Sequence, residues 1–61
     1  MKTFDIYVYD SFTGEHIDTI PSISENVLKI RCNSLATAGF DLKIVDCFDG
    51  VVVATMESMD R

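Results

Sequence analysis

The sequence predicts an α+β fold with element order ββαββ, in which one helix packs on one face of a four-stranded antiparallel sheet of order 2-1-3-4. Three observations predict it. Side chains alternate with period two near the N-terminus, apolar residues recur with a helical period in the middle, and two Val- and Ile-rich runs flank Asp49-Gly50. The 61 residues are expected to form one small domain, 1–61, with a thin core, because a chain of this length buries only about 60% of its unfolded surface.

The first hairpin is predicted from TFDIYVY, residues 3–9, and the residues that follow it. One face of this strand would hold Phe4, Ile6 and Val8, and the other Asp5, Tyr7 and Tyr9. The turn formers DSFTG come next, with a glycine that can take positive φ. We therefore expect EHIDTI, residues 15–20, to pair with the first strand after a loop of about four residues.

Pro21 is expected to end the second strand, because proline cannot donate to a β ladder. Just beyond it, Ser22 and Glu25 have the spacing of a capping box, in which each side chain satisfies a free backbone amide of the other. A helix is predicted over residues 23–38, with Gly39 as its stop. Its apolar face would consist of Ile23, Val27, Leu28, Ile30, Leu35 and Ala38.

The second hairpin is predicted after Gly39, where the period returns to two. Asp49-Gly50 favours a type I′ turn, in which both central residues have positive φ. Pairing outward from that turn would set Val45 opposite Ala54. The residues from position 57 onward are expected to fray, and no linker, internal repeat or low-complexity segment is expected.

Both faces of this second hairpin are partly apolar. One would carry Leu42, Ile44, Phe48, Val51 and Val53, and the other Val45, Cys47, Val52, Ala54 and Met56. One helix covers a single face, so the other set is at least partly uncovered, and contiguous uncovered apolar surface indicates a partner. If Val51 to Met56 forms an edge of the sheet, strand addition gives a second route of attachment.

Charge and hydropathy narrow the possible partners. Ten acidic residues against five basic ones give a net charge of −5, which disfavours contact with a phosphate backbone. The same charge favours a basic protein groove, including one that normally holds nucleic acid. No run approaches the roughly 20 apolar residues of a membrane span, and acidic residues interrupt the N-terminal segment where a signal peptide would be apolar. We expect a cytoplasmic protein, in the host cell if the chain is viral.

The sequence contains no nucleophile elbow, phosphate-binding glycine loop or zinc spacing. We therefore expect no catalytic, cofactor or metal site, and no enzyme. His16 is expected on the surface, because no second ligand pattern accompanies it. Cys32 and Cys47 lack CxxC spacing and are interpreted as small buried hydrophobic residues, with a bridge between them as the alternative.

The candidate contact residues lie on the predicted strands and helix. Asp5, Tyr7 and Tyr9 would share a strand face that is either a binding surface or part of the core. Arg31 would project from the middle of the apolar helix face, where it either packs its stem and reaches the rim or serves as an interface residue. The set predicted for partner binding is Asp5, Tyr7, Tyr9, Arg31, Asp46, Asp49, Val51 and Val53, with Asp10, Glu15 and Asp18 as further carboxylates for a basic groove.

The segment AGFDLKIVDC, residues 38–47, resembles a segment of the small T7-like phage inhibitors of bacterial RNA polymerase, which reads AGF-acidic-hydrophobic and ends in Cys. The match covers this segment and needs a one-residue gap. Those inhibitors contact the polymerase with arginines of their third strand, where this chain has Lys43 and Asp46, and a fourth strand follows here. The resemblance implies a phage-encoded protein of host takeover.

Together these features predict a non-enzymatic protein-binding inhibitor that occludes a host nucleic-acid-handling enzyme. The target would be RNA polymerase, a restriction or CRISPR nuclease, or a DNA-repair enzyme. The alternative is a homodimeric structural or assembly module whose apolar sheet face closes the dimer and which has no inhibitory role.

Overall fold

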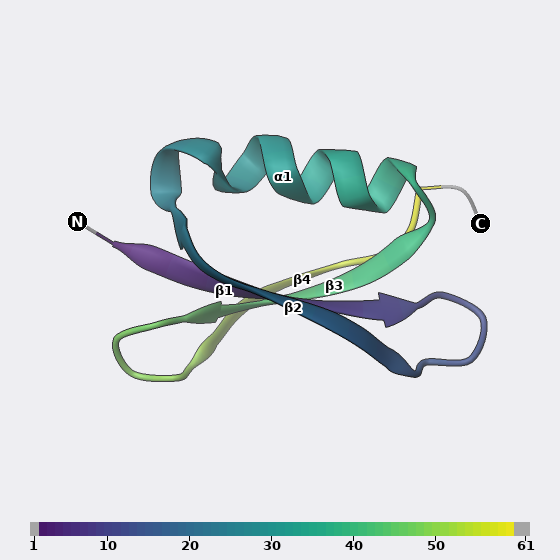
Figure 1. Cartoon of the computed structure of the whole chain (residues 1–61), viewed down its shortest axis with the longest axis horizontal. Coiled ribbons are helices and arrows are strands. Elements are labelled where there is room, and N and C mark those ends of the chain that lie inside the picture. The colour runs from purple at the N-terminus through teal and green to yellow at the C-terminus, as the bar shows by residue number, and fades with distance from the viewer. Residues whose placement is uncertain (1, 60–61) are drawn as a thin grey trace.

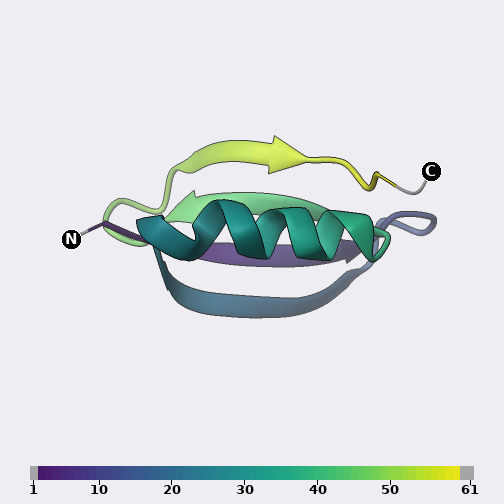
Figure 2. The ribbon, with the colours of Figure 1, turned by 90° about the horizontal axis from the view of Figure 1, so that it is seen from above.

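The computed structural model describes residues 2–59 and confirms the predicted α+β fold. Its elements are β1 (Thr3–Asp10), β2 (His16–Ser24), α1 (Glu25–Thr37), β3 (Phe40–Asp46) and β4 (Val52–Met56) (Figure 1). The strands form one sheet in the order β2-β1-β3-β4, and every neighbouring pair is antiparallel. Seen from above, α1 lies over the two central strands, β1 and β3 (Figure 2). No second layer among residues 2–59 covers the opposite face of the sheet, here called the open face.

The core lies between α1 and the sheet. Its buried members are Phe4, Ile6, Val8, Ile23, Cys32, Leu42 and Ile44. Ile6 is completely buried at the centre of β1, and burying an aliphatic side chain of this kind contributes about 1.5–3 kcal/mol. The alternation predicted for the first strand is therefore confirmed, with its apolar set facing the helix.

The predicted start of the helix is wrong, because β2 continues through Pro21 to Ser24 and α1 begins at Glu25. Proline is tolerated there because β2 is an edge strand and the register shifts at that point, where Phe4 pairs with Ile23 and Ile6 with Ile20. Ser22 has φ +56°, so it belongs to a bulge of the strand. The residue at the N-cap position is Ser24, which makes no side-chain cap hydrogen bond, and the predicted capping box is therefore not formed.

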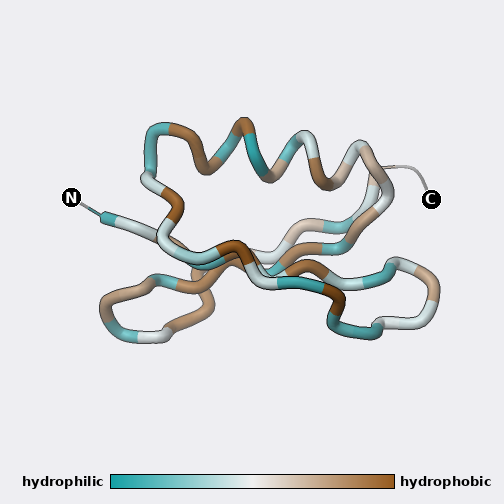
Figure 3. The backbone as a smooth tube through the Cα atoms, viewed as in Figure 1, coloured by the Kyte–Doolittle hydropathy of each residue, from teal (hydrophilic) through white to brown (hydrophobic). Residues whose placement is uncertain are grey.

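The apolar face of α1 also differs from the prediction. Cys32 and Ala36 are buried, and Leu28 and Leu35 pack against the core, which is the i, i+4, i+7, i+8 spacing of one helix face. Ile30 lies on the other side and is 70% exposed. Figure 3 shows hydrophobic positions on the outer side of the helix as well as on the inner side. Arg31 is likewise exposed, so the prediction that it projects from the middle of the packed face is wrong.

The second hairpin turns through a loop of residues 47–50 and not through a type I′ turn. The N–H of Asp46 donates to the carbonyl of Val51 at 2.9 Å, and Gly50 has positive φ whereas Asp49 does not. A type I′ turn would need positive φ at both. In the resulting register Ile44 pairs with Ala54, and the register shifts by one residue before Val45 pairs with Val52. Ala54 and Met56 therefore share the helix side with Ile44 and Leu42, and the predicted division of the apolar residues between the two faces is wrong.

The two hairpins are an internal repeat, contrary to the expectation of none. Residues 4–22 align without a gap with residues 40–58, each with the residue 36 positions further on. Seven of these 19 positions are identical: Phe4/Phe40, Asp5/Asp41, Asp10/Asp46, Phe12/Phe48, Gly14/Gly50, Thr19/Thr55 and Ser22/Ser58. The repeat is visible in the sequence as the pattern Asp-x-Phe-x-Gly, at residues 10–14 and again at 46–50.

The strand register follows the same repeat. Tyr7 pairs with Thr19 as Lys43 pairs with Thr55, and the register shift between Val8 and Tyr9 recurs between Ile44 and Val45. Between the central strands, Tyr7 pairs with Lys43, and the pairs on either side of it are equivalent. The two hairpins are therefore related by a pseudo-two-fold axis that passes through the Tyr7–Lys43 pair.

The segment after β4 is tied to the rest of the molecule. The N–H of Ser58 donates to Asp41 Oδ1 at 2.8 Å, as the N–H of Ser22 donates to Asp5 Oδ1 at 3.1 Å in the first repeat. The N–H of Met59 donates to the carbonyl of Ala36 at 3.0 Å. The prediction of fraying is therefore wrong for residues 57–59, and residues 60–61 lie outside the described part of the chain.

Candidate functional site

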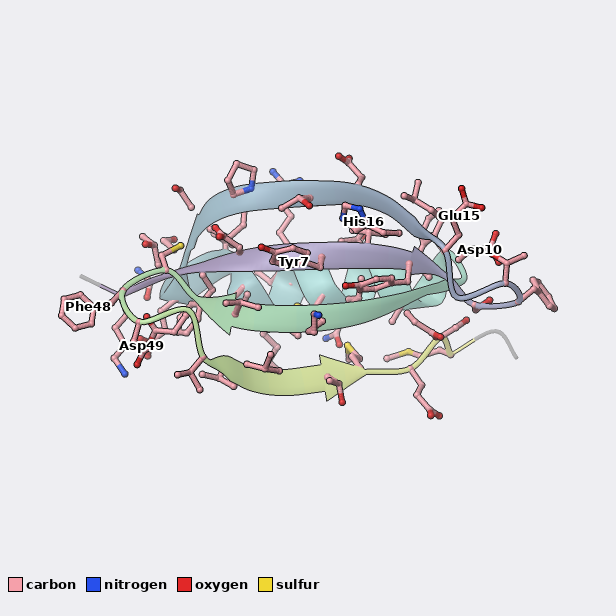
Figure 4. The ribbon with its side chains drawn as sticks, turned by 90° about the horizontal axis from the view of Figure 1, so that it is seen from below. Tyr7, Asp10, Glu15, His16, Phe48 and Asp49 are labelled. Atoms are coloured by element: carbon pink, nitrogen blue, oxygen red, sulfur yellow. The ribbon has the colours of Figure 1, made fainter. Side chains whose placement is uncertain are left out.

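The open face carries an aromatic and cationic cluster at its centre. Tyr7 and Tyr9 project from β1 on the side opposite the core, so they form an accessible surface and the alternative that they pack in the core is wrong. The ring centroid of His16 lies 5.8 Å from that of Tyr7 and 5.4 Å from that of Tyr9. Figure 4 shows Tyr7 and His16 from this side. The prediction that His16 lies on the surface is confirmed.

Lys43 completes this cluster from the neighbouring strand. Its Nζ lies 5.4 Å from the ring centroid of Tyr7 and 5.6 Å from that of Tyr9, within the range of cation–π attraction. His16 Nε2 is 2.9 Å from Thr19 Oγ1, which holds the imidazole beside the two rings. The cluster therefore presents two oriented phenol groups around a positive charge in a chain whose net charge is −5.

Asp5 lies on the same face but its carboxylate is engaged within the fold. The Sγ–H of Cys47 donates to Asp5 Oδ1 at 3.0 Å, and the N–H of Ser22 donates to the same oxygen at 3.1 Å. These hydrogen bonds hold the pKa of Asp5 below its ordinary value, and the bond from Cys47 has the larger effect. Asp5 thus joins the β2 bulge to the second loop, which is a structural role.

The two cysteines differ from each other. Cys32 is buried as predicted, and desolvation raises the pKa of its thiol. Cys47 is exposed, contrary to the prediction, because it belongs to the loop and not to β3. Both are free, so the bridge weighed as an alternative is not formed.

The loops at the two ends of the sheet have the same hydrogen bonds. In one, the N–H of Asp10 donates to the carbonyl of Glu15, and the N–H of Gly14 to the carbonyl of Asp10, both at 2.9 Å. In the other, Asp46, Gly50 and Val51 make the same two bonds, both at 2.9 Å.

The side chains of the two loops repeat as well. The carboxylates of Asp10 and Asp46 each accept the N–H of the phenylalanine two residues later, at 2.7 Å. The side chains of Thr13 and Asp49 each accept the N–H of the second residue after them.

Each loop presents an exposed phenylalanine. Phe12 is 90% exposed and Phe48 is 96% exposed. Figure 4 shows Phe48 at one end of the molecule and the loop between Asp10 and Glu15 at the other. In Figure 1 both loops bend away from α1, toward the side of the open face. We call these two side chains the Phe tips.

The Phe tips were missed at the level of the sequence, although the pattern Asp-x-Phe-x-Gly occurs twice. The other identities in the loops have structural reasons: the aspartates accept backbone N–H groups, and the glycines adopt φ +74°. No such reason accounts for two large apolar side chains left in solvent at equivalent positions. Their exposure at equivalent positions makes Phe12 and Phe48 candidate contact residues.

The structure separates several residues that were predicted to act together. Asp46 is buried, 8% exposed, and holds its loop, so the structure gives it a structural role and its contact with a partner stays a prediction. Asp49 accepts the N–H of Val51 but is exposed, as are Glu15 and Asp18. Arg31 lies on α1, in the other layer from the open face. Val51 and Val53 are exposed at the β4 edge.

Within residues 2–59 the fold encloses no pocket, and no three or more His, Cys, Asp or Glu side chains are placed to hold a metal ion together. The same residues include no helix with the length and hydropathy needed to cross a bilayer. Comparisons with protein-family models, curated proteins and solved structures found no match. The resemblance to the T7-like inhibitors therefore stays a prediction.

Proposed function

We propose that this chain is a non-enzymatic protein that binds another protein through its open face and the two Phe tips. The observation that best supports this proposal is the exposure of Phe12 and Phe48 at equivalent places in two repeated loops. Burying one such side chain in a partner pocket contributes about 1.5–3 kcal/mol, and aromatic residues of this kind are typical anchors of interfaces.

Charge supports a basic partner surface. The chain has a net charge of −5, and exposed carboxylates accompany both tips, Glu15 beside one and Asp49 beside the other. A protein surface with apolar pockets rimmed by Lys and Arg would complement this arrangement. The nucleic-acid groove of an enzyme is a surface of that charge.

The inhibitory function combines this surface with the resemblance of residues 38–47. On this proposal the chain is phage-encoded, acts in the cytoplasm of the host and occupies the groove of RNA polymerase, of a restriction or CRISPR nuclease, or of a DNA-repair enzyme. Tyr7 and Tyr9 would add contact area between the tips at low entropic cost.

The test compares the wild type with a double variant, Phe12→Ala and Phe48→Ala, as immobilised baits in bacterial lysate. The wild type should capture a nucleic-acid-handling enzyme at low salt, inhibit it in a purified assay, and release it as salt rises. The double variant should lose this capture. Ile30→Ala removes an exposed apolar side chain from α1 and should capture as the wild type does. Equal capture by all three baits would overturn the assignment to the tips.

The alternative, a homodimer closed by an apolar sheet face, is less well supported. The open face carries Asp5, Tyr7, His16 and Lys43 at its centre, so it is amphipathic and not apolar. Two copies placed face to face would have to bury these polar groups against one another, which costs free energy unless each finds a partner.

A further inference from the structure

The two edge strands occupy equivalent positions in the repeat but carry different side chains. Each follows the same loop and contains the same one-residue register shift. At the equivalent places the first edge has Glu15, His16, Ile17 and Asp18, and the second has Val51, Val52, Val53 and Ala54. The two edges therefore follow the same backbone course, and three polar or charged side chains of the first are replaced by apolar side chains on the second.

The β2 edge is protected against strand addition. Pro21 removes one donor, Ser22 with φ +56° breaks the ladder, and Asp18 places a charge on the strand. These are the devices by which sheet proteins prevent edge-to-edge association.

In its described residues the β4 edge shares with β2 the register shift that follows the loop, but it has no proline, no charge and no second shift. Residues 51–56 include no charged side chain, no proline and no glycine. Three consecutive valines, 51 to 53, are about half exposed. The strand therefore offers unpaired backbone groups and an apolar surface together.

We propose that β4 pairs antiparallel with β4 of a second copy of this chain. The product is a two-fold symmetric dimer with one continuous sheet of eight strands, four from each copy. An antiparallel pair of identical strands has two-fold symmetry, so the strand is its own complement. Two copies of a chain with net charge −5 repel each other, but residues 51–56 are uncharged and 51–55 are exposed, so the backbones of two copies can approach along this edge.

The flanks of β4 predict how salt acts on this dimer. Asp49 precedes the strand and Glu57 follows it, and antiparallel pairing brings Asp49 of one copy toward Glu57 of the other. Salt screens this repulsion and the repulsion between the net charges, so the dimer tightens as salt rises. Binding to a basic partner weakens as salt rises. The direction of the salt dependence therefore distinguishes dimer formation from the proposed binding to a partner.

The experiment measures mass by light scattering during gel filtration, over a series of protein concentrations up to submillimolar. Val53→Lys is compared with Ile17→Lys, because these residues are equivalent in the repeat and are 51% and 50% exposed. The wild type and Ile17→Lys should have twice the mass of one chain. Val53→Lys should raise the dimer dissociation constant about tenfold or more, because two like charges then meet near the symmetry axis.

A wild type that stays monomeric at the highest concentration overturns the proposal, and so does a Val53→Lys variant that dimerises as the wild type does. Hydrogen exchange on the wild type needs no variant and covers the case in which Val53→Lys fails to fold. Protection of the β4 amides should increase with protein concentration while that of the β2 amides does not. Protection of β4 that does not depend on concentration contradicts the dimer.

Discussion

The two hairpin loops have one backbone conformation in two different surroundings. Asp10 is partly exposed and its loop leads into the polar strand β2, whereas Asp46 is buried and its loop leads into Val51 and the two valines that begin β4. The glycines at the fifth position have the same φ of +74°. An aspartate, a phenylalanine and a glycine at fixed spacing thus accompany one loop shape, while the flanking strand is free to differ. The surroundings of each loop then decide how much its residues contribute to the free energy of unfolding.

The largest effect is expected from Asp46→Ala. This variant removes a buried carboxylate that accepts the Phe48 N–H at 2.7 Å, and a hydrogen bond to a charged group of this kind stabilises by about 2 kcal/mol. Urea denaturation should show that loss. Asp10→Ala should lose less, because water replaces the carboxylate at the more exposed loop. Equal losses would mean that burial does not distinguish the two loops.

The glycine positions should behave alike. Gly14→Ala and Gly50→Ala each force a side chain into the left-handed region, which costs about 1 kcal/mol. No atom lies within 4 Å of a Cβ built at either glycine, so backbone conformation is the whole cost and the two losses should agree. Denaturation midpoints measured side by side check this. A much larger loss at Gly50 would show that the second loop is held more tightly than its backbone indicates.

Much of the fold could be predicted from the sequence because apolar and polar residues recur with clear strand and helix periods. The alternation in β1 and the four-residue loop after Asp10 could be predicted, since each depends on neighbouring residues. The second loop was predicted wrongly because Asp49-Gly50 by itself favours a type I′ turn. The identical context in the first loop shows why it forms another: an aspartate four residues before the glycine accepts the phenylalanine N–H.

The other features that the sequence did not predict depend on contacts between residues far apart in the chain. The helix α1 begins later than predicted because β2 continues past Pro21. Asp5 supports this continuation by accepting the N–H of Ser22, which is 17 residues away in the sequence. The cluster on the open face joins His16 and Lys43 to two tyrosines across three strands, and no local pattern reports such a grouping. The Phe tips could have been found by aligning the chain with itself, which needs no structure.

A smaller effect is expected from pH. The N–H groups of Thr13 and Phe12 hold the pKa of Asp10 below its ordinary value of 3.8. A carboxyl whose pKa is lower in the folded state stabilises the fold above its unfolded pKa, and that contribution is lost as the pH falls through the folded pKa. The unfolding free energy of the wild type should therefore decrease below about pH 4.

Asp10→Asn should lose less stability than the wild type over that acid range. It should not remove the dependence, because the pKa of Asp5 is also lowered. Urea denaturation at neutral pH and at about pH 3 measures both slopes. If the two slopes are the same, the Asp10 carboxylate does not receive the N–H bonds of its loop in solution.

The smallest effect on stability is expected at the Phe tips. Phe12→Ala and Phe48→Ala should each leave the unfolding free energy within about 0.5 kcal/mol of the wild type, because both rings are in solvent. Denaturation of the single variants tests this. The same variants, assayed for capture of the partner, show whether the tips act as a pair: each should weaken binding, because an anchor at one end cannot replace the other. If Phe12→Ala binds as the wild type does while Phe48→Ala does not, the repeat is structural in its first half and functional in its second alone.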